Sequence, residues 1–367
     1  SYGAQEIPNR IRDNIRRTIC LEQPDKYQYM DVLGTTRIDV LPDEGIKGRG
    51  LVKLGDSTLE FQTYLALDAR DDYERMEKLK TKCEEMASYW KSSKARPIPR
   101  IPEKPIWSEF EMLPEVQKRL ADNEYLPIGY ENETADIYSI DLKNTYCYMI
   151  SGKSKTGKTN LQRVMMRGAK AKKAHICTIE LNGNELEGDT EKLGGTYIDS
   201  CEKFYQWIVK LLPVIQERNK KKKELQRNFH EKADVFDKMV TEEPYFVYIA
   251  EFSSFIKMLR SKDGMEKNLE NAMANIWEKG ELLNLYFIAA FNWDKRMDVY
   301  DSTAFKVFCN HDTGIHLGGN AEDQRLLTFP GISIRELSKT ENTGVGLTAS
   351  SDGRNSWKII TPLVKGE

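Results

Sequence analysis

The sequence predicts an α/β fold in which a mostly parallel sheet is covered by helices on both faces. Largely apolar runs, each typical of a buried strand, alternate with longer helical patterns; these runs are residues 145–150, 175–181, 245–252 and 285–291. Strands that are buried on both faces are apolar throughout, and their alternation with helices is typical of a parallel sheet. A second observation is a glycine-containing loop that joins the first of these runs to a helical pattern.

The loop has the pattern G-x-x-x-x-G-K-[ST], in which a strand enters and a helix leaves. Its glycines allow the backbone to approach phosphate closely, and its N–H groups and the following helix end attract an anion. We expect ATP and Mg²⁺ here, with Lys158 reaching the β- and γ-phosphates and the Thr159 hydroxyl binding the metal. The predicted nucleotide-binding residues are Gly152, Lys153, Ser154, Lys155, Thr156, Gly157, Lys158, Thr159 and Asn160.

A second signature follows the strand at 245–252, and it is incomplete. A phosphate-loop ATPase needs an Asp at the end of a neighbouring strand to hold Mg²⁺, and often a following Glu that polarises water. Ala250 occupies the Asp position, whereas Glu251 is kept. Asn292, at the end of the next strand, is a candidate sensor of the γ-phosphate. The alternative for Glu251 is a surface carboxylate without a catalytic role, and the alternative for Asn292 is a plain turn residue. The pattern therefore predicts a degenerate Walker B strand, with ATP binding and weak or regulatory hydrolysis.

The two ends of the chain resemble each other at a spacing of 296 residues. The matched positions are Ile19 with Ile315, Leu21 with Leu317, Gly48 with Gly344, Gly50 with Gly346, Leu51 with Leu347 and Asp56 with Asp352. A repeat at fixed spacing indicates a duplicated structural unit. We therefore interpret residues 1–66 as the β-rich tail of an upstream module, with chance similarity as the alternative. Residues 126–367 would then form the complete second module.

Residues 67–125 are predicted to connect these two parts. Residues 67–92 have the pattern of a charged amphipathic helix, and residues 92–105 contain four prolines, which favour an extended connector. Residues 113–122 are interpreted as a plain linker helix.

Composition limits the classes of function. A chain of 367 residues is long enough for more than one domain. The net charge of −2 argues against a protein that coats nucleic acid. The basic run 218–223 is interpreted as a solvated helix face, with phosphate contact as the alternative. Six cysteines without a C-x-x-C pair indicate reduced core residues rather than disulfides or a zinc site. No apolar stretch is long enough to span a membrane.

Four segments in this order resemble the FtsK/SpoIIIE-type ATPase module: LPIG at 126–129, GKSKTGKTNL at 152–161, YIAEF at 248–252 and FIAAFN at 287–292. The segments GRGLVKLG and LEFQ, in residues 1–66, resemble the end of another such module. Tandem modules of this type resemble the EssC/EccC family of type VII (ESX) secretion ATPases, and this chain is similar to the end of the second module and the whole third. The resemblance implies a RecA-like P-loop NTPase fold.

The resemblance also implies a cellular role. It suggests a motor module that engages small WXG-type helical substrates and drives or regulates their export. Implied partners are the upstream ATPase modules of the same chain and, in the full-length protein, identical subunits of a hexamer; nucleic acid is not expected as a partner. The implied location is the cytoplasmic face of the membrane, tethered through a part outside this sequence. The alternatives are a DNA translocase or conjugative coupling ATPase, and a non-catalytic docking module with ATP as a structural ligand.

Overall fold

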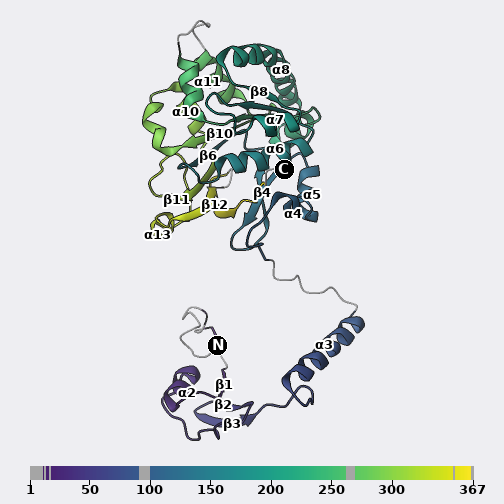
Figure 1. The fold of residues 1–367 in the computed structure, drawn as a ribbon, viewed down its shortest axis with the longest axis vertical. Coiled ribbons are helices and arrows are strands. Elements are labelled where there is room, and N and C mark those ends of the chain that lie inside the picture. The colour runs from purple at the N-terminus through teal and green to yellow at the C-terminus, as the bar shows by residue number, and fades with distance from the viewer. Residues whose placement is uncertain are drawn as a thin grey trace. The chain divides into compact units, whose positions relative to one another are not determined.

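The computed structural model describes residues 11, 14–15, 18–90, 100–261, 269–349 and 352–364. The chain divides into two compact units, residues 1–96 and 97–367 (Figure 1).

The N-terminal unit contains a three-stranded antiparallel sheet in the order β1-β2-β3. Its elements are β1 (Ile19–Leu21), α2 (Lys26–Leu33), β2 (Arg49–Leu54), β3 (Ser57–Gln62) and α3 (Asp72–Tyr89). Its core is small and consists of Cys20, Tyr29, Leu33, Ile38 and Leu51. The charged helix predicted at 67–92 is present, but it begins later, because the Asp71 side chain caps its first turn. None of the residues of α3 is buried, so its apolar side chains pack into no core among the described residues.

The C-terminal unit contains a ten-stranded sheet in the order β5-β4-β13-β12-β11-β6-β10-β9-β7-β8. Its strands are β4 (Tyr125–Glu131), β5 (Ile137–Asp141), β6 (Cys147–Gly152), β7 (His175–Ile179), β8 (Thr196–Ile198), β9 (Tyr245–Ile249), β10 (Leu285–Asn292), β11 (Gly314–Gly319), β12 (Glu341–Ala349) and β13 (Ser356–Ile360). The pairs from β11 through β6, β10, β9 and β7 to β8 are parallel, and those from β11 through β12, β13 and β4 to β5 are antiparallel.

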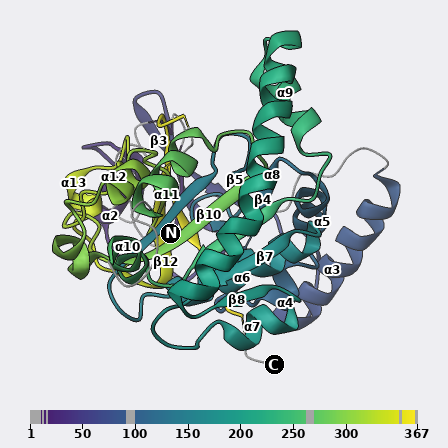
Figure 2. The same ribbon diagram turned by 90° about the horizontal axis from the view of Figure 1, so that it is seen from above.

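Helices cover both faces of this sheet. Along β6, Tyr148 and Ile150 contribute to one hydrophobic core, whereas Cys147 and Met149 contribute to the other, as the alternation of side chains along a strand requires. The helices are α4 (Trp107–Phe110), α5 (Pro114–Ala121), α6 (Lys158–Ala171), α7 (Glu187–Lys192), α8 (Cys201–Asn228), α9 (Lys232–Met239), α10 (Phe252–Arg260), α11 (Leu269–Lys279), η2 (Trp293–Asp298), α12 (Thr303–Cys309) and α13 (Ile334–Leu337). Figure 2 shows α6 on one side of the strands, with α10 and α11 on the other. The α/β P-loop NTPase fold predicted from the sequence is confirmed.

The interpretation of residues 113–122 as a linker helix is wrong. Helix α5 packs into the same core as the phosphate-loop helix, with Val116 fully buried, and the short helix α4 before it buries Trp107 and Phe110. The backbone also joins this segment to the far end of the chain, because Trp107 N donates to Leu363 O at 3.0 Å. Leu113, Val116 and Leu120 recur at helical spacing, but so few apolar positions do not show which core they join, so the sequence alone did not place this helix in the main core.

Candidate nucleotide-binding site

The phosphate-binding pattern lies between β6 and α6, as predicted. Positive φ angles at Gly152 (156°), Lys155 (63°) and Gly157 (101°) curl the backbone around one point. A Cβ atom at Gly152 would lie 2.5 Å from the carbonyl oxygen of Leu317, so no larger residue fits there. A loop of this type, which joins a strand to a helix through residues with positive φ, can present successive N–H groups to a phosphate.

The C-terminal hairpin supports the loop from one side. Gly344 N donates to Thr156 O at 3.0 Å, and Thr343 Oγ1 donates to Lys155 O at 3.2 Å. The backbone of Gly344 is also close to Gly157, where an added Cβ would lie 3.3 Å from the Gly344 nitrogen. The loop is therefore held from outside as well as by its own helix.

Lys158 is half-buried, and its ammonium group donates to the carbonyl oxygens of Gly152 at 3.0 Å and of Lys153 at 2.5 Å. Burial lowers the pKa of Lys158, while the nearby carboxylates of Asp294 and Glu251 raise it. The net pKa of Lys158 is lower than usual because the effect of burial outweighs that of the two carboxylates. A half-buried ammonium group beside this loop fits an anionic ligand.

The other predicted residues of the loop differ in their placement. Lys153, Ser154 and Lys155 are exposed, and Thr156 is buried with its hydroxyl donating to Lys153 O at 2.9 Å. Asn160 faces elsewhere: its amide nitrogen donates to Pro362 O at 2.9 Å, and its amide oxygen accepts from Val364 N at 2.8 Å. Asn160 thus fixes the C-terminal segment to α6, and its side chain has no contact with the loop among the described interactions.

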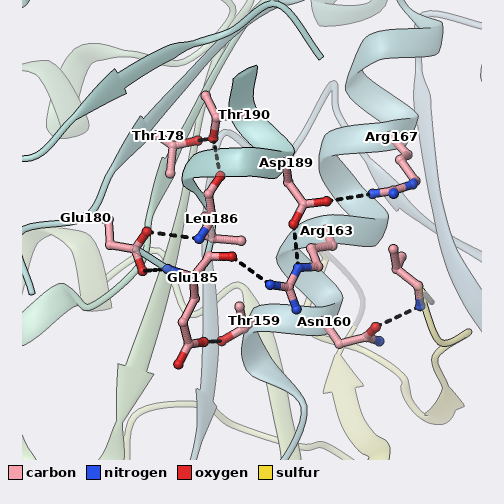
Figure 3. Close-up of polar contacts among 11 residues, drawn as sticks. Thr159, Asn160, Arg163, Arg167, Thr178, Glu180, Glu185, Leu186, Asp189 and Thr190 are labelled. Carbon is pink, nitrogen blue, oxygen red and sulfur yellow. Dashed lines mark hydrogen bonds and ion pairs between the residues drawn. The ribbon is translucent and has the colours of Figure 1, made fainter. Parts of the chain in front are cut away.

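Glu185 lies against the predicted metal ligand, and the sequence analysis did not identify it. The Thr159 hydroxyl donates to Glu185 Oε2 at 3.2 Å (Figure 3). Glu185 belongs to the loop after β7, and that loop folds back because both carboxylate oxygens of Glu180 accept backbone N–H groups, from Glu185 and Leu186, each at 3.0 Å. The sequence does show a carboxylate, Glu185, after a predicted strand. It does not show that the loop after β7 returns to α6.

Glu251 is placed at the carboxyl edge of the sheet, directly after Ala250, as predicted. Its carboxylate caps helix α10 by accepting the Ser254 N–H at 3.1 Å, together with the hydroxyl groups of Ser253 and Ser254. Burial raises the pKa of Glu251, but the Ser253 and Ser254 hydrogen bonds and the charge of Lys295, 3.6 Å away, outweigh it and keep the pKa below its usual value. Glu251 is therefore ionised at neutral pH and engaged by the helix it caps.

Asn292 pairs with Gly152 at the end of β10, so it lies beside the phosphate loop. Its Nδ2 is 3.4 Å from Ser154 Oγ, and its Oδ1 accepts from Asp294 N at 3.2 Å. The strand ends of β6, β9 and β10 thus bring the loop, Glu251 and Asn292 to one edge of the sheet, where the sequence predicted a single site.

His316 lies beneath the loop and was also missed. It is buried on β11, and its Nδ1 is 3.2 Å from Ser151 Oγ. Burial, together with the charges of Lys158 and Lys153, lowers the pKa of His316 to about 4. At neutral pH the imidazole is therefore uncharged and acts as a neutral hydrogen-bonding partner for the strand that enters the loop.

The side chains present fit a phosphate group with an associated Mg²⁺. The loop supplies N–H groups and Lys158, and Thr159 with Glu185 supplies oxygen atoms of the kind that Mg²⁺ prefers. In the part of the chain that the structure describes, no group of three or more His, Cys, Asp or Glu side chains is placed to hold a metal without such a ligand. Mg²⁺ usually binds through few protein ligands plus substrate phosphates, so a site with one hydroxyl and one carboxylate is consistent with it.

Known proteins resemble this chain in sequence and in fold. The ESX secretion system protein EccC of Geobacillus thermodenitrificans is 28% identical over 213 residues, which cover 57% of this chain and 14% of that protein. The solved structure of EssC ATPases 2 and 3 from the same species aligns with a TM-score of 0.65 and 22% identity, over 99% of this chain and 63% of that one. No model of a protein family matches.

A further neighbour is the structure of Thermomonospora curvata EccC ATPases 2 and 3 in complex with a signal sequence peptide. It aligns with a TM-score of 0.55 and 16% identity, over 100% of this chain and 61% of that one. This chain therefore spans less than two thirds of each of these proteins. The relative named above is an EccC protein and the two solved structures are of ATPases 2 and 3 of EssC and EccC, so the predicted resemblance to the FtsK/SpoIIIE-type modules of type VII secretion ATPases is confirmed.

Proposed function

We propose that the C-terminal unit binds ATP with Mg²⁺ and hydrolyses it slowly. The observation that carries this proposal is the loop between β6 and α6, with positive φ angles at Lys155 and Gly157 and the half-buried ammonium group of Lys158 beside it. The loop N–H groups and Lys158 would bind the phosphates, and Thr159 would hold the metal. A bound Mg²⁺ would neutralise negative charge on the phosphates.

Slow hydrolysis follows from what surrounds this loop. Ala250 provides no oxygen at the position where an Asp usually holds the metal. Glu251, the candidate to polarise water, is engaged by the N-terminus of α10 and by Lys295. A general base must reach the proton that it removes, so Glu251 would first have to exchange these partners. Asn292 remains the candidate sensor, since its amide already reaches the loop at Ser154.

Calorimetric titration with ATP, with and without Mg²⁺, followed by a phosphate-release assay, tests this proposal. We expect binding that Mg²⁺ strengthens, together with slow turnover. Binding without any turnover would favour the docking module in which ATP is a structural ligand. The absence of binding would refute the proposal.

We infer that the chain is part of a type VII secretion motor, anchored at the cytoplasmic face of the membrane through other parts of the protein, which engages small WXG-type substrates and drives or regulates their export. This inference is supported by the EccC and EssC relatives, one of them solved with a signal sequence peptide. Within the described residues, no helix is long and apolar enough to cross a bilayer. Fluorescence anisotropy with a labelled C-terminal peptide of a WXG-type protein from the same genome should show saturable binding.

A DNA translocase is the alternative with the same fold, and the basic run of α8 argues against it. Arg218 is buried and donates to the carbonyl oxygens of Leu283 and Asn284 at 3.1 and 2.9 Å. Lys221 pairs with Glu242 at 2.6 Å, and Lys222 donates to backbone carbonyls at 3.0 and 2.9 Å. The solvated face predicted for this run is therefore wrong for Arg218, and much of the charge is already used within the fold. Tight duplex DNA binding with a steep salt dependence would favour the translocase.

We further propose that residues 1–66 are the tail of an upstream ATPase module, followed by a connecting segment, and that the full-length protein assembles as a hexamer. The strand pairing supports the duplication. Ile19 pairs with Val52 across β1 and β2, and the residues 296 positions later, Ile315 and Thr348, pair across β11 and β12. The other two pairs of β1 recur at the same offset, so this register is shared by the two units.

The glycines of the two hairpins support it as well. A Cβ at Gly50 would collide with the carbonyl group of Cys20, and a Cβ at Gly346 would lie 2.6 Å from the carbonyl oxygen of His316, which is the position matched to Cys20. The preceding glycines also correspond: φ is 79° at Gly48 and 80° at Gly344. Gly48 and Gly344 thus both require glycine because of their positive φ, and Gly50 and Gly346 because a backbone carbonyl lies close to them.

A further inference from the structure

We propose that Glu185 is a positioning residue for Mg²⁺, and that it compensates for the carboxylate missing at Ala250. This inference rests on the proposed nucleotide function. In it, Glu185 strengthens the dependence of ATP binding on Mg²⁺. The juxtaposition that supports it is the contact between the Thr159 hydroxyl and Glu185 Oε2, at 3.2 Å.

The direction of this hydrogen bond fits this role. A hydroxyl group that binds Mg²⁺ offers a lone pair to the metal and keeps its proton. Glu185 accepts the hydrogen bond that the Thr159 hydroxyl donates, which leaves the lone pairs of Thr159 available to a metal. Outer-shell carboxylates of this kind orient metal ligands and raise their basicity. The second oxygen of Glu185 would add negative charge beside a bound Mg²⁺ and could accept a hydrogen bond from a water that Mg²⁺ retains.

The loop carrying Glu185 is fixed on several sides. Glu180 holds its backbone through the N–H groups of Glu185 and Leu186, and Arg163 Nη2 donates to Glu185 O at 2.7 Å (Figure 3). Arg163 is itself held by Asp189 through a contact of 2.7 Å. Although the Glu185 side chain is exposed, its backbone is therefore placed before any ligand arrives, which is a requirement for precise metal geometry.

Two other carboxylates near this site are already engaged by other partners. Glu251 caps α10 and contacts Lys295, and Glu180 uses both of its oxygens to hold the loop. Ala250 has no polar side chain. Among Glu180, Glu185 and Glu251, Glu185 is the one whose carboxylate contacts the predicted metal ligand Thr159.

The experiment compares three proteins: the unaltered chain, Glu185→Gln and Glu187→Gln. Each variant removes one negative charge from the same segment, but Glu187 lies in the first turn of α7, two residues further along the chain. The affinity for ATP is measured by calorimetry in EDTA and in saturating Mg²⁺, and the ratio of the two dissociation constants gives the metal coupling. The binding of Mn²⁺ to the ATP complex, measured by electron paramagnetic resonance, gives a second readout that does not depend on turnover.

We expect Glu185→Gln to lower the metal coupling by about 10- to 100-fold, the range found for outer-shell partners of metal ligands, and to weaken Mn²⁺ binding in parallel. ATP affinity in EDTA should be unchanged, and Glu187→Gln should behave as the unaltered chain. Glu185→Asp, which keeps the charge on a shorter side chain, should recover part of the coupling.

Other outcomes separate the two proposals. If the unaltered chain binds ATP with strong metal coupling and Glu185→Gln keeps it, the role of Glu185 is refuted while the nucleotide function stands. Loss of ATP affinity in EDTA by Glu185→Gln would show damage to the loop and would also refute the role. If the unaltered chain binds no ATP, the nucleotide function itself fails.

Discussion

The ammonium group of Lys158 donates a hydrogen bond of 3.0 Å to the backbone carbonyl of Gly152, so the lysine contacts the loop that precedes its own helix. A phosphate group would offer the same ammonium a charged acceptor in place of neutral carbonyls. Hydrogen bonds to charged groups contribute more than those between neutral groups. Ligand binding should therefore exchange a weak set of contacts for a stronger one and stabilise the folded unit.

Replacing Lys158 with Ala should abolish this stabilisation. At about 100 times its dissociation constant, a ligand raises the free energy of unfolding by about 2.7 kcal/mol. Thermal unfolding of the unaltered chain should shift upward with ATP and Mg²⁺, and that of Lys158→Ala should not. Lys210→Ala, which removes an exposed lysine from α8, is the control and should keep the full shift. An equal shift in Lys158→Ala would show that ATP binds elsewhere.

Introducing a carboxylate with Ala250→Asp should strengthen the dependence on Mg²⁺. The residue follows β9 at the position where phosphate-loop ATPases carry their metal-binding Asp. We expect the effect to be larger in the Glu185→Gln background, since one carboxylate would then replace the other. The metal coupling is measured for the unaltered chain, for Ala250→Asp, for Glu185→Gln and for the double variant, which together form a double-mutant cycle. Purely additive effects would mean that the two positions do not serve the same metal.

The fragment 97–367 should fold, whereas the fragment 126–367 should be strongly destabilised. The second fragment lacks α4 and α5, which bury Trp107, Phe110 and Val116 against the main core. Phe110→Ala in the full chain tests the same packing and should cost about 3–5 kcal/mol. Urea unfolding measures both. A stable 126–367 fragment would place the boundary of the module after α5, as the sequence alone suggested.

Acid should destabilise the C-terminal unit through His316. Its pKa falls from the ordinary value of 6.5 to about 4 on folding. Between these values the unfolded chain binds a proton that the folded chain does not, so stability decreases as the pH falls from 6.5 toward 4. A difference of this size corresponds to on the order of 3 kcal/mol. His316→Gln should flatten the pH dependence of urea unfolding, and His230→Gln, an exposed control on the same chain, should not.

Local pattern and topology together made much of the fold predictable. The phosphate loop, its helix α6 and the buried strands β6, β7, β9 and β10 each carry a signal within their own residues, and parallel strands bring their carboxyl ends to one edge. The role of Glu185 could not be predicted, because it depends on a loop that Glu180 and Arg163 fold back onto α6. The burial of Phe110 likewise depends on packing between distant segments.

The phosphate loop depends on contacts with residues that the ribosome makes last. Thr156 accepts its hydrogen bond from Gly344, and Asn160 holds the backbone at Pro362 and Val364. When β6 and α6 have been synthesised, these later residues have not yet been translated. The loop would therefore gain its final shape only when translation reaches the last strands, so a truncated product would carry the motif without a finished site.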